Sequence, residues 1–147
     1  MRKIFLLIFL FVVVVVYGQE IFQTYKVNEI YCGKKHTVNF ESNRTARVYR
    51  TVILENYRLS GVNFAGHYFF VYWGCGSPCA GSAIVDVITG KVYDGPDSAF
   101  GYKFEKDSRL VIVNPRGRLD NQKELEEVYQ EEKWVWAEKS NVFVKLE

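Results

Sequence analysis

The segment that most constrains the fold is the aromatic-rich run 64–73. In an extended chain alternate side chains point to opposite faces, and here both faces carry large apolar or aromatic groups, at residues 69, 71 and 73 and at residues 68, 70 and 72. A strand that is hydrophobic on both faces is typical of a sheet covered from both sides. We therefore expect residues 64–73 to form a central strand.

This run leads into a tight turn that contains two cysteines. Cys75 and Cys79 flank a Gly-Ser-Pro sequence, in which glycine and proline let the chain reverse sharply. A disulfide between them would stabilise the fold by roughly 2 kcal/mol, whereas a Cys32–Cys75 disulfide, with its longer loop, would contribute roughly 4 kcal/mol. Proximity in the fold decides between the two pairings. We favour Cys75–Cys79, with Cys32 left over.

The spacing of these cysteines also bears on metal and redox chemistry. Zinc sites and thioredoxin-like motifs use C-x-x-C pairs, but three residues separate Cys75 from Cys79, and no second pair follows. We therefore expect neither a metal ion nor another cofactor.

Short apolar segments recur along the rest of the chain. We expect strands at residues 83–88, 91–93, 102–104, 110–113, 133–137 and 142–146, and two earlier ones at residues 24–30 and 37–40. Tight turns such as Thr89-Gly90 join neighbouring segments. Consecutive strands joined in this way form an antiparallel meander.

Two helices complete the predicted fold. Residues 43–59 place apolar side chains at helical spacing and arginines on the opposite arc, with Ser42 as the expected N-cap. A short acidic helix is expected to begin at Asp120, within the segment 120–132. The predicted fold class is α+β: an antiparallel β-meander with one amphipathic helix packed on the sheet and a short acidic helix near the C-terminus.

The first residues have the pattern of a secretory signal peptide. Arg2 and Lys3 precede the apolar run 4–17, and Gly18 offers a small residue for cleavage. The alternative is a membrane anchor, but a spanning helix needs about 20 apolar residues. We expect residues 1–18 to be a signal peptide and residues 19–147 to form a single exported domain, periplasmic or secreted, in a compartment where disulfides persist.

Charge narrows the range of partners. The chain has 19 Lys and Arg against 17 Asp and Glu, and two of the basic residues lie in the signal peptide. A domain without net charge lacks the basic footprint that nucleic-acid binding needs. We expect a protein or a small ligand of the cell envelope as the partner, no nucleic acid, and membrane contact only through the signal peptide before cleavage.

Several blocks resemble a family of small, uncharacterised exported bacterial proteins: Asn63-Phe64-Ala65-Gly66-His67-Tyr68, Trp73-Gly74-Cys75-Gly76 with Cys79, and Asp86 with Thr89-Gly90. The resemblance covers roughly residues 34–147. It implies a single exported domain and names no reaction. Cys32 and the acidic segment 120–132 depart from the family pattern.

The surface around the turn 74–81 is the expected binding site of a non-catalytic interaction module. A glycine- and proline-containing turn held by a disulfide is preorganised, and exposed aromatic side chains beside it supply contact area. The candidate binding residues are Trp73, Tyr72, Gly76 and Ser77.

Two alternatives come from other functional classes. The first is a small hydrolase that uses His67 with Asp86, with Arg109 as a further candidate, although we expect His67 in the core and Asp86 in stabilisation of the Thr89-Gly90 turn. The second is an inhibitor of a secreted hydrolase such as lysozyme, in which the constrained turn inserts into the enzyme. Residues 31–33 and 38–40 are similar to the opening strands of periplasmic lysozyme-inhibitor barrels. Catalysis is the less favoured class.

Overall fold

The computed structural model describes residues 20–117 and 128–147. The predicted signal peptide lies outside this part of the chain, as does most of the acidic segment 120–132 with its predicted helix. No helix in the described part is long and apolar enough to cross a bilayer.

Two consecutive helices take the place of the single helix predicted over residues 43–59. They are α2 (Arg44–Val48) and α3 (Arg50–Leu59). Tyr49 separates them, because its backbone (φ −101°, ψ 25°) departs from helical geometry. Because of this break, the Tyr49 ring lies against the sheet, unlike the arginines that flank it in sequence.

The helix start also differs from the prediction. Asn43, and not Ser42, is the N-cap of α2, since its side-chain oxygen accepts a hydrogen bond from the Ala46 amide (2.7 Å). The Ser42 hydroxyl instead accepts from the Val92 amide (3.0 Å). These two neighbours therefore tie the start of the helix to a strand that lies far from it in sequence.

The first sheet is a three-stranded antiparallel meander. It contains β1 (Tyr68–Gly76), β2 (Cys79–Asp86) and β3 (Val92–Asp94), in that order. β1 is thus an edge strand, and the prediction of a central strand is wrong in this respect. It starts later than predicted, because residues 64–67 form a turn in which the Tyr68 amide donates to the Phe64 carbonyl (3.0 Å).

The second sheet continues the meander with four strands. It contains β4 (Tyr102–Phe104), β5 (Leu110–Val113), β6 (Glu132–Ala137) and β7 (Val142–Lys145), all antiparallel and in sequence order. The single predicted meander is therefore split into two sheets at the loop after β3. Pro96, which has no amide proton to contribute to a ladder, lies in this loop.

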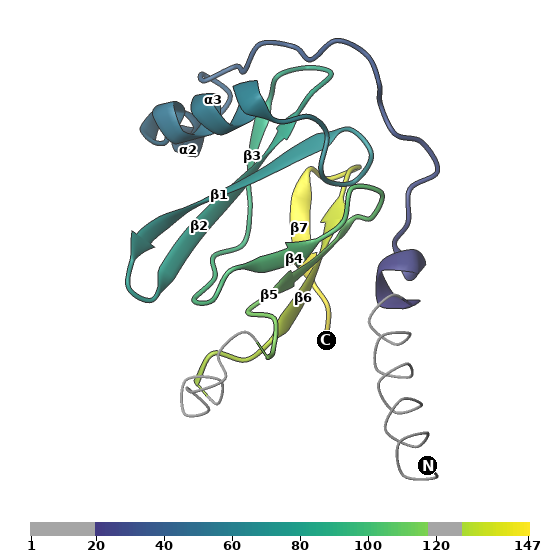
Figure 1. Ribbon diagram of the computed structural model, residues 1–147, viewed down its shortest axis with the longest axis vertical. Helices are drawn as coiled ribbons and strands as arrows, with labels where there is room; N and C mark the ends of the chain where they lie inside the picture. Colours follow the sequence, from purple (N-terminus) through teal and green to yellow (C-terminus); the bar gives the residue numbers. More distant parts are fainter. Residues whose placement is uncertain (1–19, 118–127) are drawn as a thin grey trace, which may run out of the picture.

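The two sheets and the helices form stacked layers (Figure 1). One face of the first sheet packs on α2 and α3, through Val71, Val85 and Ile53 among others. Its other face packs on the second sheet around Phe70 and Trp136. The expectation that strand 64–73 is covered on both faces is confirmed for residues 68–71, which a helical layer and a second sheet enclose, but Tyr72 is exposed.

The N-terminal part of the described chain covers the outer face of the second sheet. Phe22 is buried there against Leu110, Ile112 and Val135. The Ser108 hydroxyl donates to the Phe22 carbonyl (2.8 Å) and fixes the segment in place. Phe22, close to the predicted signal peptide in sequence, thus belongs to the packed fold.

The predicted strands 24–30 and 37–40 are wrong. Residues 24–30 contribute only an isolated bridge between Lys26 and Ser108, and residues 37–40 run as a loop. Their backbone groups bond to other loops, as the donation from the Asn39 amide to the Gly90 carbonyl (2.8 Å) shows. β-type composition was sufficient for an extended chain but not for membership of a sheet.

Candidate functional site

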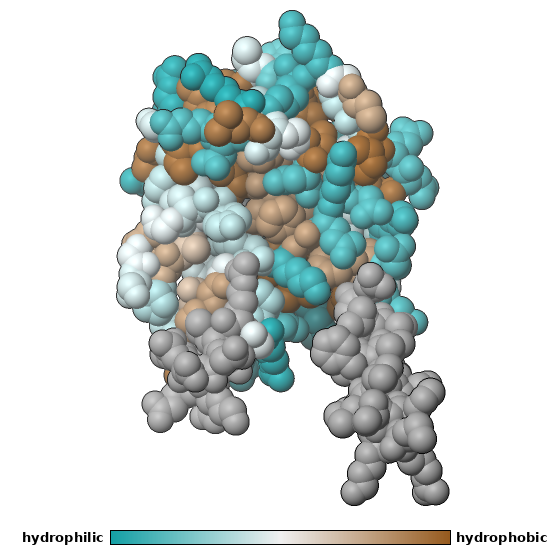
Figure 2. Space-filling view, in the orientation of Figure 1, coloured by the Kyte–Doolittle hydropathy of each residue, from teal (hydrophilic) through white to brown (hydrophobic). Residues whose placement is uncertain are grey.

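The turn between β1 and β2 is closed by the predicted disulfide. Cys75 and Cys79 are bonded, with their Cα atoms 5.1 Å apart, whereas Cys32 is a free, exposed thiol. Residues 74–78 are all exposed, so Gly76 and Ser77 lie at the surface. We call residues 74–78 the hairpin tip; the region around it in Figure 2 is pale, which marks residues of intermediate hydropathy.

The two candidate aromatic residues beside the tip face opposite ways. Tyr72 is 51% exposed and lies near Tyr102 on the side of the second sheet, with ring centroids 5.5 Å apart. Trp73 points toward the helices, is only 8% exposed and stacks on Tyr49 with ring centroids 4.2 Å apart. They do not form one exposed aromatic surface, because neighbouring side chains in a strand alternate between its faces.

Trp73 instead contributes to a hollow on the helix side of the first sheet. We call this the disulfide-side hollow; its volume is about 410 Å³ and it is lined by Thr45, Tyr49, Trp73, Cys75, Gly81, Ser82, Asp94, Gly95 and Asp97. Two carboxylates stand among these residues and no lysine or arginine does. The hollow thus combines an aromatic pair with negative charge.

The indole N–H of Trp73 has no hydrogen-bond partner, although it is buried. Its cross-strand neighbour is Gly81, and a Cβ added there would lie 2.9 Å from the indole nitrogen. Glycine at residue 81 is therefore what lets the indole lie against β2. A buried donor without a partner is unusual, since most such groups are satisfied by protein or by water.

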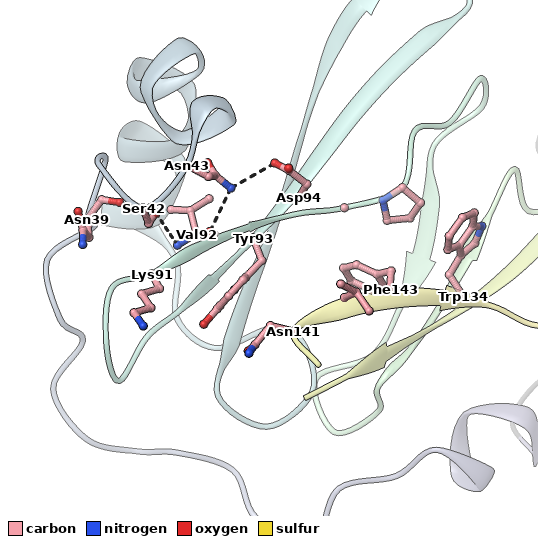
Figure 3. A pocket seen from close by; sticks show the side chains of 13 residues that line it. Asn39, Ser42, Asn43, Lys91, Val92, Tyr93, Asp94, Trp134, Asn141 and Phe143 are labelled. Atoms are coloured by element: carbon pink, nitrogen blue, oxygen red, sulfur yellow. Dashed lines mark hydrogen bonds between the residues drawn. The ribbon is translucent and has the colours of Figure 1, made fainter. Parts of the chain in front are cut away.

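A second hollow lies between the two sheets (Figure 3). We call it the inter-sheet hollow; its volume is about 560 Å³ and its lining includes Asn39, Ser42, Asn43, Lys91, Tyr93, Asp94, Gly95, Pro96, Trp134, Asn141 and Phe143. Asp94 and Gly95 line both hollows. We call the two together the groove.

Internal bonds fix the helix side of the inter-sheet hollow. The Asn43 amide group donates to the Val92 carbonyl (3.1 Å) and to Asp94 Oδ1 (3.2 Å), as Figure 3 shows. On the opposite side Trp134 and Phe143 come from the β6–β7 hairpin. Aromatic rings from one sheet therefore face polar groups held by the other.

Tyr93 carries a hydroxyl into this hollow. Burial, together with the negative charge of Asp86, raises the pKa of Tyr93. The phenol therefore stays neutral at physiological pH and is available as a hydrogen-bond donor and acceptor.

The candidate catalytic residues lie elsewhere, in structural roles. Asp86 accepts hydrogen bonds from the Ile88 amide (2.9 Å) and the Thr89 hydroxyl (2.6 Å), so the expected role in the turn is confirmed. The expectation that His67 lies in the core is wrong, because it is half-buried in the turn before β1. Its ring packs on Tyr68, and its carbonyl accepts from the Val87 amide (3.0 Å).

Arg109 has a structural contact as well. Its guanidinium lies 3.5 Å from the carbonyl of Trp136, to which it donates a hydrogen bond. The neighbouring Asp107 pairs with Lys26 (3.2 Å) instead of with this arginine. Both oxygens of Asp86, the partner proposed for His67, are engaged in the turn, and no hydrogen bond or ion pair joins the side chains of His67, Asp86 and Arg109 in the described part of the chain.

Several residues of the groove were missed from sequence. Asp94 and Asp97 read as parts of a loop, Tyr49 as one position of a helix face, and Trp134 and Phe143 as strand residues. The sequence Asp94-Gly95-Pro96-Asp97 lies between two predicted strands, where turn chemistry explains it without a binding site. Only the packing of separate elements gives these residues a common site.

Metal binding has no obvious site in the described part of the chain, where no three His, Cys, Asp or Glu side chains are grouped to hold an ion. Comparisons of the chain with protein-family models, with curated protein sequences and with solved structures found no match.

Proposed function

We propose that this protein is an exported, non-catalytic binding module of the cell envelope, periplasmic or secreted, whose ligand lies in the groove. The disulfide suits an oxidising compartment, where such bonds persist. The ligand is a small molecule or a segment of another protein.

The observation that carries this proposal is that two hollows share Asp94 and Gly95 in their linings. Ligand sites typically combine apolar and aromatic walls with a few polar groups that fix orientation. Here the walls include Trp73 and Trp134, and the polar groups come from the loop before α2, from the end of β3 and the loop after it, and from the β6–β7 turn. Between them, the two linings include residues of the helices and of both sheets.

Binding is favoured over hydrolysis because Asp86, the carboxylate that would act with His67, serves the fold. Asp86 is only 8% exposed, and its carboxylate accepts hydrogen bonds within its own turn. A general base must reach the proton that it abstracts, and a carboxylate held in this way does not.

The test is binding of a defined panel by the purified protein, followed by protein-detected NMR. The panel contains N-acetylated oligosaccharides, short peptides of basic, acidic and neutral composition, and fatty acids. The proposal expects at least one compound to shift resonances of Trp73, Asp94 or Trp134 in a saturable way, with no chemical change in the compound. Shifts confined to residues outside the groove, or conversion of a compound to product, would overturn it.

Inhibition of a secreted hydrolase is the second candidate, and the hairpin tip favours it. Residues 74–78 are exposed at the end of a two-stranded hairpin and are closed by a disulfide. A rigid, protruding loop loses little conformational entropy when it enters an active-site cleft. Assays against a panel of lysozymes and proteases test this candidate: inhibition that is lost on Ser77→Trp supports it, and unchanged rates with every enzyme exclude it for that panel.

A further inference from the structure

The lining of the disulfide-side hollow indicates which class of ligand it binds, if the groove is the ligand site proposed above. The hollow carries Asp94 and Asp97, both exposed, and no basic side chain lines it. Two basic residues of the nearby helices are engaged elsewhere: Arg47 lies 3.5 Å from Glu41, and Arg50 lies over the ring of Phe40. The charge of the two carboxylates is thus not balanced by residues of the hollow itself.

The aromatic pair adds a second preference for positive charge. Tyr49 and Trp73 stack at 28° between their planes and both line the hollow. Indole and phenol rings have a negative face, which attracts ammonium and guanidinium groups. Aromatic rings and carboxylates therefore favour the same kind of ligand here.

The indole N–H of Trp73 supplies an independent observation. It belongs to a side chain that is 8% exposed, and no group of the described chain accepts from it. The other buried indole N–H without a partner, in Trp136, lies in the core between the sheets and lines neither hollow. A ligand with an acceptor beside its cationic group would satisfy the Trp73 donor, which the fold leaves open.

We propose that the disulfide-side hollow binds an organic cation, an alkylammonium or guanidinium group, which lies between the carboxylates of Asp94 and Asp97 and the Tyr49–Trp73 pair. A neighbouring carbonyl or hydroxyl oxygen of the ligand accepts from the Trp73 indole. The cation can belong to a basic side chain of a peptide or to a free amine, since both present the same chemistry.

Two matched pairs of probes test the inference on the purified protein. Nα-acetyl-lysine methylamide carries an ammonium group and amide carbonyls, and Nα-acetyl-norleucine methylamide has a similar chain without charge. Butylamine carries the cation without a carbonyl, and butanol lacks both. Calorimetry measures affinity, and the NMR signal of the Trp73 indole reports contact.

We expect the lysine derivative to bind at least tenfold more tightly than the norleucine derivative and to shift the Trp73 indole signal. Butylamine should bind more weakly than the lysine derivative, and both affinities should fall as salt is added, because exposed charges are screened. Equal binding of the charged and neutral probes, or binding that leaves the indole signal unchanged, would overturn the inference.

Variants that each remove one negative charge distinguish attraction by the hollow from attraction by the overall charge of the protein. Asp97→Asn should weaken binding of the lysine derivative by about fivefold, the value of one exposed ion pair. Asp107→Asn is the matched control: it removes the same charge from a carboxylate that pairs with Lys26 and lines neither hollow, and it should leave affinity unchanged. Equal losses in both variants would show unspecific attraction and contradict the proposal.

A further variant tests the indole donor. Trp73→Phe keeps an aromatic ring but removes the N–H, so the lysine derivative should lose more affinity than butylamine, which loses only the stronger attraction of an indole ring for a cation. Equal effects on both probes would refute the hydrogen bond. If no cationic probe binds, yet compounds of the wider panel still shift Trp134 signals, the cation inference fails and the proposed function stands.

Discussion

The side chain of Asn63 pairs with the backbone of Phe70 as a neighbouring strand would. Its carbonyl oxygen accepts from the Phe70 amide (2.6 Å), and its amide group donates to the Phe70 carbonyl (3.0 Å). Phe70 lies in β1, the edge strand of the first sheet, so Asn63 occupies part of an edge that would otherwise remain open. The Asn-Phe-Ala-Gly-His-Tyr block thus has a role in the architecture of the sheet.

Replacement of Asn63 by alanine should destabilise the fold. The Phe70 amide and carbonyl are part-buried in this pair, and loss of a partner for such groups costs about 1–3 kcal/mol each. We expect Asn63→Ala to lower the free energy of unfolding by about 2–3 kcal/mol in urea titrations. Asn56→Ala is the control: its side chain makes one exposed bond within α3, and the change should stay within about 0.5 kcal/mol. Equal effects would contradict this role for Asn63.

Gly66 should tolerate no side chain. Its φ is +81°, and a Cβ placed there would come within 2.4 Å of the Glu29 carbonyl oxygen. We expect Gly66→Ala to lower the free energy of unfolding by more than about 1–2 kcal/mol, the usual cost of this conformation for a residue with a Cβ. Gly61→Ala is a suitable control, because a Cβ at Gly61 meets no atom within 4 Å. Similar melting temperatures for both variants would disprove the close approach.

The thiols should differ in reactivity. Cys32 is exposed and free, whereas Cys75 and Cys79 are bonded. We expect one thiol to react with a maleimide in the native, unreduced protein and three after unfolding and reduction. The Cys75→Ala and Cys79→Ala double variant should lose about 2 kcal/mol of stability, as expected for a short closed loop, and Cys32→Ser should lose none. A native thiol count other than one would contradict the pairing.

Stability should fall steeply in alkali because of buried tyrosines. Burial raises the pKa of Tyr57 and of Tyr102 to about 12, and both hydroxyls donate to backbone carbonyls. In the unfolded chain these phenols ionise near pH 10, so between about pH 10 and 12 the folded state binds more protons and stability declines with rising pH. The free energy of unfolding should fall by up to about 1.4 kcal/mol per pH unit for each tyrosine.

Melting temperatures and tyrosinate absorbance, followed from pH 8 to 12, provide the measurement. Tyr57→Phe should flatten the decline while it lowers stability at neutral pH, since it removes the bond to the His36 carbonyl (2.8 Å). A decline that is unchanged in both Tyr57→Phe and Tyr102→Phe would show that other groups cause it.

Features that depend on neighbouring residues could be predicted from the sequence. The bounds of β4 and β5 agree with the predicted segments, and the Cys75–Cys79 pairing and the turn role of Asp86 are confirmed. The disulfide and the Asp86 bonds join residues within four positions of one another, so turn chemistry and short loop closure were sufficient to predict them. The bounds of β4 and β5 follow from short apolar segments bordered by turn residues.

The tertiary structure alone decided how these elements are arranged. The division into two sheets, the position of β1 at an edge and the groove all depend on contacts between distant segments, such as Tyr49 with Trp73 and Asn43 with Asp94. Apolar side chains on both faces of a strand predict that both faces are buried, but they do not indicate which elements of the fold cover them. The site belongs to this second level, because its aromatic rings and carboxylates are brought together by packing and not by spacing along the chain.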